Sequence, residues 1–376
     1  MITKIKVNNF KSLVDFEIGL SEFNCLVGLN GSGKSTVLQF LDFLSQLMIG
    51  NVGSWLETRQ WKAADLNSKV SKKSNIDFEV IVQINSSNVV WSGSFNRTSL
   101  SCTQESIYVD GQLLLNVEDG KFTIDGISYD IIFKHQGSLL SALKDRETYK
   151  VLAILKDIVI DIRSLELLSP ELLRSKSRSS DGRLGIGGEK LSALIHESGS
   201  HVTSNLVTNL KKIYPQLEDI KTKSIRSGWK QLEIIENFDG KKITSVARHM
   251  NDGMLRLMAI LLQIETSESF LLFDEIENGI NPELIEYLVD MLVRCENQIM
   301  VTTHSPMILN YLEDEVARKG VIYLYKNSKG ATQSIRLFDI PSMAKKLKFM
   351  GPGEVFVDTD LTTLFKEISS DSLEVK

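Results

Sequence analysis

The sequence is poor in the residues that define several special classes of protein. It has only three cysteines in 376 residues, Cys25, Cys102 and Cys295, which are far apart and form no C-x-x-C pair. This argues against a disulfide framework and against a structural zinc site. No apolar run reaches the ~20 residues of a membrane helix, and Met1–Lys6 contains no apolar core of a secretion signal. We therefore expect a cytoplasmic protein with no membrane segment.

An excess of basic charge is also missing. The chain has 43 Lys and Arg against 48 Asp and Glu, with 42% hydrophobic residues, which is typical of a globular protein. This balance does not indicate an obligate nucleic-acid binder, although local basic patches keep nucleic acid open as a ligand. These patches are Lys69 with Lys72 and Lys73, and Arg174 with Lys176 and Arg178, and solvated loops explain them more simply. The length of the chain predicts two or three domains.

One glycine-rich stretch, residues 28–36, carries the strongest chemical signal. Its sequence G-L-N-G-S-G-K-S-T matches G-x-x-x-x-G-K-[ST], the phosphate-binding P-loop. Glycines let the backbone aim its N–H groups at phosphate oxygens, Lys34 adds charge for the β- and γ-phosphates, and Ser35 can ligate Mg²⁺. An apolar strand precedes the loop, and a helix opened by Thr36 follows it with its positive end toward the phosphates. The predicted nucleotide-binding residues are Asn30, Gly31, Ser32, Gly33, Lys34, Ser35 and Thr36.

The rest of the chain alternates between strand and helix patterns. Strands are expected over 1–8 and 13–20, and from Ile76 to Ile127 short β runs separated by Asp-Gly turns predict an antiparallel β subdomain. Residues 51–75 predict an irregular helix that buries Trp55 and Trp61. Further along, we expect helices over 138–163 and 189–214, a mobile loop over 174–188, strands over 217–225 and 229–237, and a strongly apolar helix within 243–265.

A second set of chemical residues follows the apolar helix. The apolar strand 269–273 ends in Asp274 and Glu275, the Walker B arrangement, in which Asp274 holds Mg²⁺ and Glu275 orients and deprotonates the attacking water. The next strand, 298–303, ends in His304, which we expect to hydrogen-bond the γ-phosphate and hold the water in line with Glu275. The predicted catalytic residues are therefore Glu275, His304 and Lys34.

The order of these parts resembles the ABC-type ATPase heads of the RecF, OLD and SMC group. More closely, the chain resembles stand-alone bacterial AAA-family proteins called AAA_21 or OLD-like ATPases. The resemblance covers nearly the whole chain, and its anchors are residues 9–12, 28–36, 251–256, 273–282 and 302–306. It implies an α/β fold: an ABC-type P-loop head with a mostly parallel central sheet, an antiparallel β subdomain and a helical insertion.

The resemblance also implies roles that spacing alone does not show. Asn251, Asp252 and Gly253 correspond to the signature segment that caps the γ-phosphate of the other subunit, with Asn251 where the family usually has serine. Gln136 resembles the glutamine loop that senses Mg²⁺, with a polar turn residue as the alternative. Lys11 and Ser12 are placed to touch the nucleotide, with solvent exposure as the alternative. The implied metal ligands are Ser35, Asp274 and Gln136, and the implied cofactors are ATP and Mg²⁺.

On this basis the chain divides into ATPase lobe I (1–137), a helical and β insertion (138–242), ATPase lobe II (243–340) and a C-terminal extension (341–376). We expect an ATP-hydrolysing switch that dimerises head-to-head, or forms a higher homo-oligomer, and drives a separate effector protein, with anti-phage defence or toxin-like control as the setting. The sequence lacks the long heptad repeats of a coiled coil, so we expect no SMC-like arm.

The alternative is a protein that processes nucleic acid itself, as a DNA-stimulated ATPase or a nuclease. Asp358 and Asp360 mimic a D-x-D metal pair, but they lack an earlier partner strand with its own acid. Only about seventy residues follow His304, too few for the TOPRIM-type nuclease domain of OLD proteins. A capping turn into a helix near Leu361 is the simpler interpretation of this pair.

Overall fold

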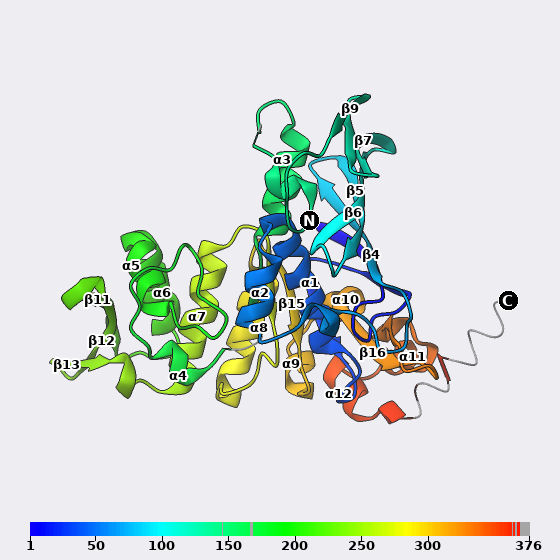
Figure 1. Ribbon diagram of the computed structural model, residues 1–376. Helices are drawn as coiled ribbons and strands as arrows, with labels where there is room; N and C mark the ends of the chain where they lie inside the picture. Colours follow the sequence, from blue (N-terminus) through cyan, green and yellow to red (C-terminus); the bar gives the residue numbers. More distant parts are fainter. Residues whose placement is uncertain (145, 166–167, 363, 365–366, 369–376) are drawn as a thin grey trace. The chain divides into compact units, whose positions relative to one another are not determined.

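The computed structural model describes residues 1–144, 146–165, 168–362, 364 and 367–368 (Figure 1). The chain divides into two compact units: unit 1 is Met1–Ile162 with Gln298–Lys376, and unit 2 is Arg163–Asn297. Within the described residues, no helix has the length and apolarity to cross a membrane. The predicted division into four segments stays a prediction.

Unit 1 contains an eight-stranded antiparallel sheet, which confirms the β subdomain predicted from the Asp-Gly turns. Strand β4 alternates along its length between buried and half-buried residues, as one-sided burial requires. The two N-terminal strands join this sheet, because β1 pairs with both β2 and β4. In spatial order the strands are β2 (Phe16–Gly19), β1 (Ile2–Asn8), β4 (Asn75–Ile84), β5 (Ser87–Asn96), β6 (Ser101–Val109), β7 (Gln112–Glu118), β8 (Lys121–Ile124) and β9 (Ile127–Asp130).

Unit 1 also contains the strand that leads into the P-loop. Strand β3 (Phe23–Val27) is fully buried and lies between β15 (Gln298–Thr302) and β16 (Val321–Lys326), parallel to both, while β17 (Thr332–Arg336) pairs antiparallel with β16. Continuous burial explains why β3 and β15 lack polar alternation. Because β3 and β15 run in parallel, with Leu26 opposite Thr302, the segments that follow them emerge at the same edge.

The P-loop helix α1 (Lys34–Ile49) is held by an aromatic cluster. Phe43 lies 5.0 Å from Phe95 on β5 and 5.8 Å from Trp55 on α2 (Val52–Thr58), measured between ring centroids. Phe10 stacks on Phe43 at 5.5 Å. Aromatic rings bury large areas and add specific ring contacts, so this cluster fixes α1 against the antiparallel sheet. The other helices of unit 1 are η1 (Ala63–Leu66), η2 (Leu139–Ala142), α3 (Lys150–Ile160), α9 (Pro306–Asn310), α10 (Asp314–Gly320), η6 (Leu337–Asp339), α11 (Pro341–Lys346) and α12 (Pro352–Val357).

A buried carboxyl group ties β6 to the segment before η2. Glu105 accepts hydrogen bonds from Trp91 Nε1 at 2.7 Å, from Leu139 N at 2.9 Å and from the Ser138 hydroxyl. Burial raises the pKa of Glu105, and the three hydrogen bonds act in the opposite direction. Sequence reasoning missed this group, because a single Glu in a strand pattern carries no sign of its burial.

We expect Glu105→Ala to lower the free energy of unfolding by about 3 kcal/mol, because it leaves buried donors without an acceptor. Chemical denaturation monitored by tryptophan fluorescence measures the change. The matched control is Glu118→Ala, an exposed acid on neighbouring β7, for which we expect a change within about 0.5 kcal/mol. A loss below about 1 kcal/mol for Glu105→Ala contradicts the assignment of Glu105 as a structural link.

Unit 2 is built on the buried helix α7 (Asp252–Thr266), which contacts both α4 and α6. The predicted strands near 217–225 and 229–237 are present. A third strand, β13, extends into the range 243–265 that the sequence predicts to contain the apolar helix, because the Asp239-Gly240 turn closes a hairpin. Strand β10 (Ile162–Leu165) begins at the last residue of unit 1 and continues into unit 2. The described elements of unit 2 that follow it are α4 (Pro170–Leu173), α5 (Leu191–Glu197), α6 (Gly199–Lys211), β11 (Leu217–Ser224), η3 (Arg226–Gly228), β12 (Lys230–Phe238), β13 (Lys241–Val246), η4 (Ala247–His249), α7, β14 (Phe270–Phe273), η5 (Pro282–Leu284) and α8 (Ile285–Arg294).

Candidate nucleotide-binding site

The P-loop has the backbone shape that its glycines predict. Gly28, Gly31 and Gly33 all have positive φ, at 149°, 77° and 113°. A Cβ on Gly28 would lie 2.3 Å from the Leu324 carbonyl oxygen, and one on Gly33 would lie 2.3 Å from Thr332 Oγ1. Two of the three glycines are therefore required both by conformation and by the close approach of neighbouring chain.

Polar groups of the loop converge on its interior. The Lys34 ammonium donates to the carbonyl oxygens of Gly28 at 2.9 Å and Leu29 at 3.3 Å, and its side chain is 6% exposed. The Ser32 hydroxyl is buried and has no hydrogen-bond partner among the described residues. A buried polar atom without a partner costs free energy, and a phosphate oxygen would satisfy it. These residues fit the phosphates of a nucleoside triphosphate.

The remaining P-loop residues lie where a phosphate site needs them. Asn30 and Gly31 are exposed on the crest of the loop, and Ser35 and Thr36 are half-buried in the first turn of α1. The helix begins at Lys34, two residues before the predicted start at Thr36. The N–H groups without an intrahelical acceptor at the positive helix end therefore belong to the P-loop residues Gly33 to Thr36.

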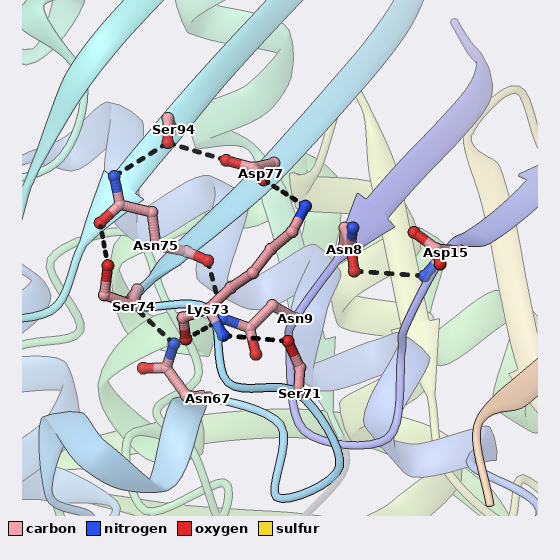
Figure 2. Close-up of polar contacts among 10 residues, drawn as sticks. All are labelled: Asn8, Asn9, Asp15, Asn67, Ser71, Lys73, Ser74, Asn75, Asp77 and Ser94. Atoms are coloured by element: carbon pink, nitrogen blue, oxygen red, sulfur yellow. Dashed lines mark hydrogen bonds and ion pairs between the residues drawn. The ribbon is translucent and has the colours of Figure 1, made fainter. Parts of the chain in front are cut away.

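The loop that carries Lys11 is anchored by Asn9, as Figure 2 shows. Asn9 is fully buried with φ at 71°, and its Nδ2 donates to the carbonyl oxygens of Lys73 at 2.8 Å and Asn75 at 2.7 Å. Asn75 Nδ2 donates in turn to Ser94 Oγ, and Ser94 Oγ donates to Asp77. The antiparallel sheet therefore fixes the backbone from which Lys11 and Ser12 project.

Lys11 and Ser12 are not simple solvent-exposed residues. Lys11 Nζ donates to Gln39 Oε1 on α1 at 2.8 Å and lies 3.3 Å from the ring centroid of Trp61, a cation–π contact. Both residues line a cavity of about 480 Å³ together with Trp61 and the 65–70 segment. Their predicted contact with nucleotide stays a prediction, and their position beside α1 agrees with it.

Two residues that tie this region together were missed by sequence reasoning. Thr332 Oγ1 lies 2.8 Å from Ser12 Oγ and donates to the Ser32 carbonyl oxygen at 2.8 Å. The same Thr332 Oγ1 accepts a hydrogen bond from Lys326 Nζ at 3.0 Å. Burial lowers the pKa of Lys326. Since Thr332 is 300 residues from Ser32 and matches no motif, only the fold reveals it.

His304 follows β15 and is exposed. Thr303 N donates to the Leu26 carbonyl oxygen at 3.2 Å, so His304 emerges at the edge where β3 runs into Gly28. Within unit 1 the fold thus brings the predicted switch histidine to the edge that carries the P-loop. This placement supports the predicted contact with the γ-phosphate.

Gln136 has a structural partner in this conformation. Its Oε1 accepts a hydrogen bond from Gly53 N at 2.9 Å, in the first turn of α2, and its carbonyl oxygen accepts one from Ser141 Oγ. The alternative of a polar turn residue therefore describes its present contacts. Its role as a ligand of Mg²⁺ stays a prediction.

The Walker B residues lie at the end of β14, which is buried at all four positions. Asp274 is half-buried and Glu275 is exposed, with φ at 45°. Asn278 donates to Glu275 twice, from Nδ2 to Oε2 at 3.0 Å and from N to the carbonyl oxygen at 2.9 Å. A non-glycine residue in the left-handed region costs free energy, and such strain is common at functional sites.

An arginine of α7 holds this strained turn. Arg256 Nη2 lies 3.3 Å from the Glu275 carbonyl oxygen and 3.5 Å from that of Asp274. Burial lowers the pKa of Arg256, and the nearby carboxylates of Glu275, Glu277 and Asp274 raise it in part. The sequence showed Arg256 within a signature-like anchor but gave no sign of this contact.

The signature-like segment is capped and packed within unit 2. Asn251 is the N-cap of α7, with its Oδ1 accepting from Met254 N at 2.7 Å, which explains a short polar residue here. Asp252 forms an ion pair with Arg174, which also donates to the Met250 carbonyl oxygen. A Cβ on Gly253 would lie 3.2 Å from the Gly279 carbonyl oxygen. Contacts of these residues with a nucleotide stay predictions.

The Asp358–Asp360 pair has local partners. Asp358 forms an ion pair with Lys346 at 2.9 Å, and Asp360 Oδ1 accepts from Thr362 N at 2.9 Å. The second contact is that of a helix cap, as the simpler interpretation predicts. Part of the helix expected after Leu361 lies outside the described residues.

Two family models match the chain. Residues 1–153 match AAA_15, described as an AAA ATPase domain, and residues 156–310 match AAA_21, described as an AAA domain, putative AbiEii toxin, type IV TA system. Together they confirm the AAA_21 resemblance, whereas the closer likeness to OLD proteins stays a prediction. No curated protein matches the chain.

Solved structures of SMC heads share the fold. An SMC head bound to the C-winged helix domain of ScpA is 17% identical, with a TM-score of 0.58 over 93% of this chain and 99% of that chain. An SMC head with an extended coiled coil, bound to the C-terminal domain of ScpA derived from Pyrococcus furiosus, is 14% identical, with a TM-score of 0.54 over 92% and 99%. The SMC head domain from Thermotoga maritima is 13% identical, with a TM-score of 0.50 over 89% and 98%. These matches confirm the predicted α/β fold of an ABC-type head.

Proposed function

We propose that the chain hydrolyses ATP between two head-to-head copies and so switches a partner protein. The matches of residues 1–153 to AAA_15 and of residues 156–310 to AAA_21, together with the fold of an SMC head, support this proposal. The observation that carries this proposal is the P-loop, where a buried Lys34 ammonium and a Ser32 hydroxyl with no hydrogen-bond partner in the described part of the chain lie beside the N-terminus of α1. This arrangement suits the triphosphate of a nucleotide.

The residues divide the reaction among themselves. The P-loop and Lys34 would hold the phosphates, Ser35 and Asp274 would hold Mg²⁺, and Glu275 would orient and deprotonate water while His304 hydrogen-bonds the γ-phosphate. When bound, Mg²⁺ would offset the negative charge of the phosphates. The signature segment Asn251–Gly253 of a second copy closes the site. The lobes of such a head follow the four-segment division predicted from the sequence.

The partner and the setting are further parts of the proposal. Two of the similar SMC heads were solved bound to domains of ScpA, which supports a separate protein partner here. The description of AAA_21 as a putative toxin supports a role in toxin-like control or anti-phage defence, in the cytoplasm of a bacterium. These steps rest on similarity and not on the chemistry of the site.

Two measurements on the unmodified protein test this function. Release of phosphate from ATP with Mg²⁺ tests hydrolysis, and light scattering after size-exclusion chromatography, with and without ATP, tests dimerisation. We expect turnover that requires Mg²⁺ and a shift toward dimer with ATP. Absence of nucleotide binding in a folded protein refutes the proposal.

We expect Arg256→Gln to lower the rate of ATP turnover about tenfold while leaving ATP affinity within about twofold. The reason is that Arg256 holds the backbone of Glu275, the proposed base, and is not one of the residues proposed to bind the phosphates. The control is Arg248→Gln, an exposed arginine of η4, for which we expect wild-type turnover. Combining Arg256→Gln with Glu275→Gln should add little, since both act through the same carboxylate, and a fully additive loss argues against this positioning role.

A further inference from the structure

The three-stranded sheet of unit 2 ends in a surface rich in basic residues. Residues 172–180 contain three Lys and Arg, residues 220–232 contain four, and neither segment contains Asp or Glu. This contrasts with the formal net charge of −5 for the whole chain. Figure 1 shows the sheet as β11, β12 and β13.

Backbone pairing brings the two basic segments side by side. Ser177 and Lys230 form an antiparallel bridge, in which Lys230 N donates to the Ser177 carbonyl oxygen at 2.8 Å. Strand β13 pairs with β12 only from Glu233 onward, so Ser177 occupies the edge of β12 that β13 leaves open. The segment around Ser177, which the sequence predicted as a mobile loop, is thereby anchored to the sheet.

Strand alternation decides which side chains face solvent. Ser177 is buried, and its Oγ accepts a hydrogen bond from Ala193 N on α5, so this residue faces the interior. Its neighbours Lys176 and Arg178 therefore face outward, and both are exposed. The Arg178 guanidinium lies 5.0 Å from the ring centroid of Trp229, which is 37% exposed.

The cations of this surface are not neutralised. Among the described residues, Lys176, Arg178, Lys223 and Arg226 have no carboxylate within 4.0 Å, whereas nearby Lys221 lies 3.3 Å from Asp219. Lys223 and Arg226 are exposed, on β11 and in the turn after it. Like charges on one surface without carboxylate partners repel each other, and an anionic ligand would relieve this repulsion.

We propose that the basic–aromatic tip, consisting of Lys176, Arg178, Lys223, Arg226 and Trp229, binds single-stranded nucleic acid. Lysine and arginine contact backbone phosphates, and the exposed part of the Trp229 ring stacks on an unpaired base, which a duplex does not offer. The exposed hydroxyl of Ser227, in the turn between β11 and β12, supplies a further phosphate donor.

A membrane surface fits this tip less well. Exposed apolar residues of the sheet, Phe238 and Ile243, lie at its opposite end, beside the Asp239-Gly240 turn. A membrane contact needs apolar side chains next to the cations, whereas serines surround them here. Binding of single-stranded nucleic acid at this tip does not depend on the proposed ATPase activity.

Fluorescence anisotropy with a labelled 20-nucleotide oligo(dT) tests the proposal without ATP. For about four phosphate contacts, we expect affinity to fall about 50-fold between 50 and 200 mM salt. Arg178→Glu combined with Lys223→Glu should weaken binding at least about tenfold, and Trp229→Ala about tenfold. The control Lys241→Glu, an exposed lysine at the other end of the same sheet, should change affinity less than about twofold.

Several results would overturn the proposal. One is a wild-type protein that does not bind the oligonucleotide, and another is equal binding by the wild type and the tip variants. Tighter binding to a duplex or to phosphatidylserine vesicles than to the single strand would assign the surface to another ligand. Thermal unfolding confirms that each variant is folded. A Lys34→Ala protein should still bind the strand, so failure of the ATPase proposal and failure of this one are distinguishable.

Discussion

Lys34→Ala should abolish ATP binding, with an affinity loss of at least about 100-fold, or roughly 3 kcal/mol. The Lys34 ammonium is buried inside the loop and is held by the carbonyl oxygens of Gly28 and Leu29, so its charge is already placed where phosphates bind. Charge-assisted hydrogen bonds in such a desolvated site are the strongest available. Isothermal titration with ATP and Mg²⁺ measures the affinity.

The variant needs two controls, because Lys34 also supports the shape of the loop. Lys34→Met keeps the apolar stem and removes the charge, so it should lose affinity as Lys34→Ala does while preserving the unfolding temperature. Lys319→Ala removes an exposed lysine of α10 that is paired with Glu315 and should bind ATP normally. If both Lys34 variants bind ATP with wild-type affinity, the loop is not the phosphate site.

Glu275→Gln should lower ATP turnover by about 100-fold or more while ATP still binds, because a general base contributes on the order of 10²–10⁴ in rate. The amide has the shape of the carboxylate and still accepts the hydrogen bond from Asn278 Nδ2, so the strained turn is retained. Since hydrolysis is what separates the two copies in the proposed cycle, this variant should accumulate as an ATP-bound dimer. Phosphate release and light scattering provide the two readouts.

The control for Glu275→Gln is Glu283→Gln, an exposed acid of η5 on the same segment, which should turn over at the wild-type rate. Two outcomes contradict the proposal in different ways. Normal turnover by Glu275→Gln removes this residue as the base. A Glu275→Gln protein that hydrolyses ATP slowly but remains monomeric with ATP is consistent with Glu275 as the base, and it refutes the head-to-head switch.

Much of the site was predictable because its parts are local in sequence. Glycines at fixed spacing dictate the P-loop shape, and an apolar run followed by acids predicts a buried strand that opens at its carboxyl end, as β14 does. Asn251 was predictable in position as a helix start, because short polar side chains cap helices. The antiparallel sheet was predictable because the Asp-Gly turns that join its strands are also local signals in the sequence.

Other parts were out of reach because they depend on contacts between distant residues. The side chain of Gln136 accepts a hydrogen bond from Gly53 N, which lies 83 residues earlier, and no sequence pattern indicates this contact. Thr332 and Arg256 hold the P-loop and the Glu275 turn through hydrogen bonds to backbone carbonyls, and such bonds leave no pattern in the sequence. The pairing of Ser177 with Lys230 belongs to the same class.

The sequence by itself identified the groups to which we assign the proposed chemistry: the glycine loop with Lys34, the acids after β14 and the histidine after β15. It did so because phosphate and Mg²⁺ chemistry demands particular side chains at particular spacings, and each of these three groups lies within its own short segment of the chain. Only the tertiary structure decided what holds these groups in place, from the Asn9 anchor to the Arg256 contact, and which basic residues form one surface around Trp229. Those arrangements arise when long-range packing brings segments together, and the energy of packing is spread over many residues that no single motif records.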